Sequence, residues 1–114
     1  MSKKDQYGLE FYKINPNNNK THNCRRKNGI VDQNNDLQFL NDLDVSKTEF
    51  LLREINSYFN TTPDPNWTTY ESMVLEHIEL SIEYPNFRIG ERPYTFLLTD
   101  IRDLLQEWLV FLQS

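Results

Sequence analysis

One histidine and the single cysteine of the chain stand close together in sequence. His22 and Cys24 are separated by one residue, and Arg25 and Arg26 follow them. A thiol beside positive charges has a lowered pKa and, with a histidine as base, can act as a nucleophile. Zinc needs about three or four ligands, however, and the other histidine, His77, lies far along the chain. We therefore expect a polar loop with a free thiol and no metal site, and keep a small hydrolase that uses Cys24 as a third hypothesis.

Carboxylates are plentiful, and two sets of them are closely spaced: Glu76, Glu79 and Glu83, and Asp42 and Asp44. Such sets can do acid–base chemistry or bind a divalent metal, but hydrolases that use them also need a cleft. A chain of 114 residues has few residues left to wall a cleft once its core is built. Its three glycines form no loop that could cradle a phosphate. We expect no enzyme, no metal and no cofactor, so the carboxylates either solvate the surface or bind another protein.

An acidic strand beside exposed-type aromatic residues is the feature that most favours protein binding. Alternation places His77, Glu79, Ser81 and Glu83 on one face of a strand, and Trp67 and Tyr70 lie just before it. Tight protein inhibitors of basic enzymes combine an acidic field with aromatic anchors. Alternatively, Trp67 covers the core edge and the acids only solvate the sheet. The candidate partner-binding residues are Trp67, Tyr70, Glu76, Glu79 and Glu83, with Asp42 and Asp44 in second rank.

The net charge of −5 hides an asymmetry along the chain. Residues 1–30 hold seven bases against two acids, whereas residues 31–114 hold five bases against fifteen acids. A body this acidic repels a phosphate backbone and attracts basic proteins. We expect no nucleic-acid partner, and we expect the basic cluster Arg25–Arg26–Lys27 to be a solvated loop or an internal partner of the acidic body.

The cysteine count and hydropathy bear on location. A lone cysteine excludes an intramolecular disulfide and fits a reducing compartment. The chain has no basic start followed by an apolar run, and no stretch approaches roughly 18 apolar residues. We expect a cytoplasmic protein with no membrane partner, built as a single domain over residues 1–114.

Two helices have clear signals. Ser46 and Glu49 form a capping box that predicts a helix over about 46–60, with Val45 and Phe50 as a hydrophobic staple. A second helix is predicted over about 99–113, capped by Thr99 or Asp100, because its apolar residues recur at helical spacing.

Strands are predicted at 9–14, at 77–84 and at 94–98. Asn28–Gly29 is a weaker hairpin signal, because apolar residues flank it on one side only. Residues 67–76 could extend a strand or form a short helix, and the segment around Leu37–Leu43 could be a helical turn or a covering loop. The fold class is therefore α+β, a single small domain with a mainly antiparallel sheet packed by the two helices.

The closing segment carries a family resemblance. Residues 94–112 read Tyr-Thr-Phe-Leu-Leu-Thr-Asp-Ile-Arg-Asp-Leu-Leu-Gln-Glu-Trp-Leu-Val-Phe-Leu. This segment resembles the final strand and helix of small bacterial immunity proteins, which protect a cell from polymorphic or contact-dependent inhibition toxins. The resemblance implies a cytoplasmic α+β inhibitor that is made beside its toxin, often a nuclease, and that binds it by charge and shape complementarity. It transfers no functional residue, because such families diverge most at their binding faces.

Two hypotheses lead. The first is an immunity-type protein that binds and neutralises a cognate toxin with a basic surface. The second is a non-catalytic bacterial or phage accessory protein that scaffolds an assembly, as a homodimer joined through a strand edge. The sequence leaves open whether the protein is a monomer or a homodimer.

Overall fold

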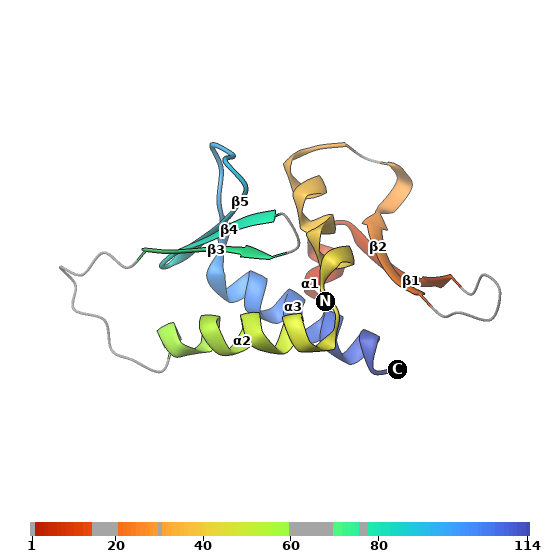
Figure 1. The fold of residues 1–114 in the computed structure, drawn as a ribbon. Coiled ribbons are helices and arrows are strands. Elements are labelled where there is room, and N and C mark those ends of the chain that lie inside the picture. The colour runs from red at the N-terminus through yellow and green to blue at the C-terminus, as the bar shows by residue number, and fades with distance from the viewer. Residues whose placement is uncertain (1, 15–20, 30, 60–69, 76–77) are drawn as a thin grey trace.

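The computed structural model describes residues 2–14, 21–29, 31–59, 70–75 and 78–114, and only the backbone of residues 21, 70–75 and 78. Figure 1 shows helices packed with two antiparallel sheets, which confirms the predicted α+β class. The elements in chain order are α1 (Lys3–Gln6), β1 (Leu9–Ile14), β2 (Thr21–Arg26), η2 (Lys27–Gly29), η3 (Gln33–Asp42), α2 (Val45–Phe59), β3 (Tyr70–Leu75), β4 (Ile78–Glu83), β5 (Asn86–Ile89), β6 (Phe96–Leu97) and α3 (Leu98–Leu112). No helix in the described part of the chain is long and apolar enough to cross a membrane.

The two long helices cover the larger sheet. In Figure 1, α2 and α3 run below the sheet formed by β3, β4, β5 and β6 in that order. Both helices turn an apolar stripe inward, as their spacing predicts. Leu80 and Ile82 of β4 and Phe87 of β5 are fully buried. The predicted alternation along 77–84 therefore holds at Glu79, Leu80 and Ile82, whereas Ser81, predicted on the outer face, is only 3% exposed. Residues 70–75 form a strand and not a helix.

The N-terminal elements form a smaller ribbon. β1 and β2 pair antiparallel from Leu9↔Arg26 to Ile14↔Thr21, and η3 packs beside β2. The Asn41 side chain accepts a hydrogen bond from the Cys24 amide at 2.6 Å and donates one to the Cys24 carbonyl at 2.9 Å. Cys24 therefore lies in a strand, with its outward backbone groups satisfied.

Trp108 joins the two parts of the molecule. Its side chain is 1% exposed, and its indole N–H donates to the Leu43 carbonyl at 3.0 Å. The Phe11 ring of β1 meets the indole edge-on at a centroid distance of 5.0 Å. One continuous core therefore runs from the ribbon to the four-stranded sheet.

The predicted cap of the first long helix is wrong, although the helix itself lies within one residue of its predicted span. Asp44, not Ser46, caps α2: its carboxylate accepts from the Lys47 amide at 2.8 Å, and its carbonyl accepts from the Thr48 hydroxyl at 2.7 Å. Aspartate caps a helix as well as serine does, and this start buries Thr48 with its hydroxyl satisfied. Phe50 is 38% exposed, so the predicted staple is absent.

The predicted cap of the second long helix, Thr99 or Asp100, is also wrong, although this helix too lies within one residue of its predicted span. α3 begins at Leu98, and no side chain caps it. The Leu98 amide instead donates to the Pro85 carbonyl at 3.0 Å, so a neighbouring turn replaces the capping side chain. This early start shortens the predicted strand 94–98 to the two residues of β6.

Asn28–Gly29 does not make a hairpin. Both residues have positive φ, 59° and 66°, and lie in η2, which ends β2 and turns the chain toward η3. The connection between β1 and β2 falls at residues 15–20, outside the described chain.

Candidate protein-binding surface

The predicted aromatic anchor is not tested. Trp67 and Glu76 lie outside the described residues. Tyr70 is the first residue of β3 and pairs in register with Glu83, but only its backbone is described. An anchor beside the acidic strand therefore stays a prediction.

The two described acids of β4 differ. Glu79 is exposed, whereas Arg88 of β5 holds Glu83 in a two-pronged ion pair, with Nε–Oε2 at 2.7 Å and Nη2–Oε1 at 3.1 Å. The hydrogen bond from Arg88 lowers the pKa of Glu83 and outweighs the opposing effect of burial. Ser81 between them is 3% exposed, so this strand face is not a continuous acidic row. The tight β4–β5 turn, which pairs Glu83 with Asn86, brings Arg88 into reach.

The basic N-terminal segment is largely paired within the protein. Arg25 contacts Glu10 at 3.1 Å, and Lys27 contacts Asp5 at 2.7 Å. Two further bases reach acids beyond residue 30: Arg26 pairs with Asp32 at 3.0 Å and Lys3 with Asp100 at 2.9 Å. These bases neutralise part of the negative charge of residues 31–114, so the electric field of that region is weaker than the charge count indicates.

The thiol of Cys24 is free, as expected, but it does not lie in a polar loop. Cys24 is 2% exposed within β2, because it faces the core of the ribbon. Burial raises the pKa of its thiol to about 12, and the positive charge of Arg26 offsets only part of that rise. The thiolate that a nucleophile requires is therefore strongly disfavoured at this site.

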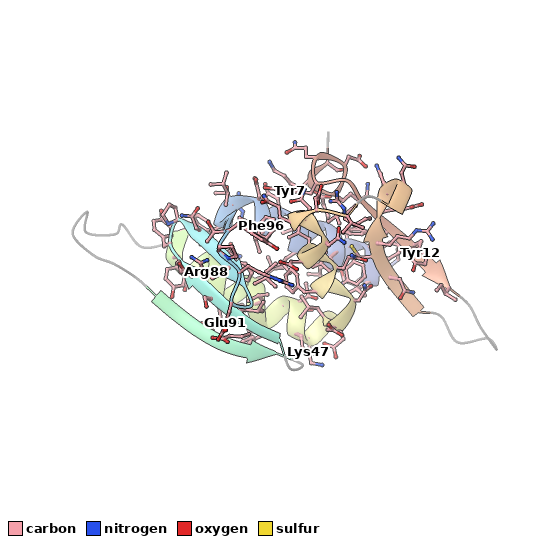
Figure 2. All side chains as sticks on the ribbon, turned by 90° about the horizontal axis from the view of Figure 1, so that it is seen from above. Tyr7, Tyr12, Lys47, Arg88, Glu91 and Phe96 are labelled. Atoms are coloured by element: carbon pink, nitrogen blue, oxygen red, sulfur yellow. The ribbon has the colours of Figure 1, made fainter. Side chains whose placement is uncertain are left out.

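Six acids with described side chains have no ion pair within the described part of the chain: Asp42, Glu49, Glu54, Glu79, Glu91 and Glu107. Glu107 instead accepts hydrogen bonds from the backbone amides of Lys3 and Lys4. The six stand on the end of η3, on α2, on β4, in the turn after β5 and on α3. Figure 2 shows Glu91 and Arg88 near the sheet, whereas Tyr12 lies at the opposite side of the molecule on β1. The remaining negative charge is thus carried by several elements and not by the β4 face alone.

Asp42 and Asp44 stand beside a hollow of about 350 Å³, which we call the acidic hollow. The short turn between η3 and α2 places both carboxylates at the surface, and the Asp44 side chain is 65% exposed. The remaining lining consists of His22, Asn23, Asn41, Leu43, Trp108 and Leu112. β2, η3 and α3 therefore each contribute a wall, and the second-ranked pair of predicted acids has the best-defined surroundings.

The acidic hollow combines charge with apolar surface. Lys47 stands 4.0 Å from the Asp44 carboxylate, and the His22 ring meets Phe111 edge-on at 5.0 Å. His22 and Asp42 could not be connected from the sequence, because the packing of η3 beside β2 brings them together.

The described residues contain no group of three histidine, cysteine, aspartate or glutamate side chains that could hold a metal ion. No family model, no curated protein and no solved structure matches this chain. Its function is therefore inferred from its own surface.

Proposed function

We propose that this chain is an immunity-type protein that binds and neutralises a cognate toxin domain with a basic surface, such as a nuclease. The acidic hollow carries the proposal. It combines two exposed carboxylates, Asp42 and Asp44, with apolar walls from Leu43, Trp108 and Leu112. Charge at the rim and apolar area inside are what a buried cationic anchor requires.

The size of the acidic hollow favours one side chain of a partner. Its volume of about 350 Å³ is at the lower end of the range of roughly 300–1,000 Å³ that small-molecule pockets span. An arginine fits this chemistry, because its aliphatic stem packs on apolar surface while its guanidinium pairs with carboxylates. We expect an arginine or lysine of the toxin to enter between Asp42 and Leu112.

The acids without described ion pairs would act at longer range. Charges at Glu79 and Glu91 lie outside the hollow, yet they add to the field that a cationic protein meets on approach. Such fields raise association rates more than they raise affinity. The net charge of −5 thus raises the association rate, and the acidic hollow provides the contact that holds the partner.

The test removes charge from the hollow without unfolding α2. Asp42→Lys reverses one charge, and Asp44→Asn removes the other while keeping a good helix cap. Combined, they should slow association with the protein encoded by the neighbouring gene about tenfold at low salt, and flatten its salt dependence. Stopped-flow fluorescence measures the rate.

Glu54→Lys combined with Glu49→Gln provides the matched control, because it changes the charge by the same three units on α2, outside the hollow. The proposal is wrong if this control slows association as much as the double variant does. It is equally wrong if co-expression of this chain leaves cells sensitive to the neighbouring gene product.

A second candidate function is supported by the sheet edge. β3 pairs with β4 on one side, and no other described strand pairs with it. An edge strand offers backbone groups to a second chain, which suits a homodimeric bacterial or phage accessory protein that scaffolds an assembly. Sedimentation velocity distinguishes the two: a stable dimer without a neighbouring toxin favours scaffolding.

A further inference from the structure

The first described residues form a short segment that charge holds in place. α1 contains four residues, none of them buried, and an isolated helix of that length is unstable in water. We call residues 2–6 the strap. Its position must therefore come from its contacts: the Asp5 carboxylate pairs with Lys27 of η2 at 2.7 Å, and further contacts are made with α3.

The contacts with α3 are polar and lie on one acidic stripe of that helix. The Glu107 carboxylate accepts hydrogen bonds from the Lys3 amide at 2.8 Å and from the Lys4 amide at 3.1 Å. The Lys3 ammonium lies 2.9 Å from the Asp100 carboxylate, and Asp103 adds attraction from the next turn. Asp100, Asp103 and Glu107 follow helical spacing, so they share one face.

The strap ends where firmer contacts begin. The buried Arg26 guanidinium donates to the Tyr7 carbonyl, and the Lys27 amide donates to the Gly8 carbonyl at 2.9 Å. Gly8 has φ of +66°, which lets the chain turn from α1 into β1. Residues from Tyr7 onward are thus fixed by the ribbon, whereas the strap is fixed by exposed or half-buried charges.

The strap forms one wall of a groove of about 790 Å³. Its other residues include Phe11, Val110 and Phe111, which make the groove apolar, and Val110 is 69% exposed. Movement of the strap would therefore uncover both the acidic stripe and the adjoining apolar surface.

We propose that the strap is an autoinhibitory contact, which a basic segment of the partner displaces from the acidic stripe of α3. This inference rests on the proposed function, because it assigns the partner a lysine-rich segment. Charge complementarity identifies that occupant: the stripe already binds a lysine and two backbone amides in the free protein. Displacement opens the groove to apolar side chains of the same partner segment.

An octalysine peptide serves as the probe, and two substitutions give opposite predictions. Lys3→Gln weakens the strap and leaves the stripe intact, so octalysine should bind about two- to five-fold more tightly. Asp103→Asn damages the stripe and leaves the hydrogen bonds between the strap and Glu107 in place, since the described ion pair of Asp103 is with Arg102, so binding should weaken by a similar factor. Isothermal titration calorimetry at low salt measures both, and circular dichroism verifies that each variant is folded.

Controls correct for net charge. Arg53→Gln and Glu54→Gln make the same charge changes on α2, away from the strap, and each affinity is read relative to its own control.

The inference is overturned if Lys3→Gln and Asp103→Asn shift affinity in the same direction, or if both match their controls. Octalysine binding that Asp42→Lys abolishes and Lys3→Gln leaves unchanged also overturns it, while the proposed function at the acidic hollow stands. If octalysine does not bind at all, the strap proposal fails, and the neighbouring gene product still decides the proposed function.

Discussion

The parts of the molecule before and after Asp44 are stabilised in different ways. The N-terminal part, residues 2–43 as described, contributes buried apolar side chains to the core but also depends on polar contacts such as Arg26–Asp32, Lys3–Asp100 and the hydrogen bond from Tyr94 to Asp36. The C-terminal part, from α2 to α3, is held by apolar stripes that face the four-stranded sheet. Apolar burial is robust to salt and pH, whereas polar contacts are not. The N-terminal part should therefore be the more easily perturbed.

The largest effect is expected where the two parts meet. Trp108→Ala removes a buried ring and its hydrogen bond to Leu43, so unfolding should become easier by about 3–5 kcal/mol. Because the indole also contacts Phe11, both parts should lose stability together. Urea unfolding followed by circular dichroism measures the change.

Val110→Ala on the same helix provides the comparison. Val110 is 69% exposed, so this substitution should change stability by less than about 0.5 kcal/mol. Similar losses of stability for both substitutions would contradict the conclusion that Trp108 connects the two parts of the core.

A smaller effect should separate the two parts. Arg26→Gln removes a guanidinium that is 6% exposed, pairs with Asp32 and donates to the Tyr7 carbonyl. We expect a loss of about 2 kcal/mol, because Asp32 is itself 46% exposed and is rehydrated easily. Hydrogen exchange should show faster exchange of the β1 and β2 amides with little change in α3. Equal acceleration in α3 would refute the separation.

The smallest expected effect is the loss of the ion pairs of Asp5 and Asp100 at low pH. The hydrogen bond from Lys27 lowers the pKa of Asp5 to about 2. Burial alone would raise the pKa of Asp100, but hydrogen bonds from Tyr7 and Lys3 hold it below its ordinary value. Because both carboxyls bind protons more weakly when folded, their stabilisation is complete above pH about 4 and is lost as pH falls toward 2.

The amide signals of α1 should therefore broaden or shift between pH 4 and 2 before those of the middle of α3. Nuclear magnetic resonance spectra recorded along an acid titration measure the order. Simultaneous loss of both sets of signals would indicate that the two parts respond to acid as one unit.

The fold was predictable where burial is periodic. The stripes of α2 and α3 and the alternation of β4 fixed the element types, and errors arose only at their ends. Asp44 replaced Ser46 as a cap because both residue types cap well and tertiary packing chooses between them. The absence of a capping side chain at the start of α3 could not be predicted, because the carbonyl that satisfies its first amide belongs to a distant turn at Pro85.

The candidate surface was less predictable. Acidity identified Asp42 and Asp44, but the partners that make the acidic hollow come from β2 and α3. The pairing of Glu83 with Arg88 depends on strand register, which composition does not reveal. Charge counts therefore locate candidate residues and overstate their free charge, since they ignore neighbours across a sheet.

Asn41 has a consequence for how the molecule behaves at high concentration. By occupying the outward amide and carbonyl of Cys24, it removes the central hydrogen-bonding positions that another β-strand would need to extend the ribbon. Together with the packing of η3 beside β2, this side chain protects the outward edge of the ribbon from pairing with a strand of another molecule.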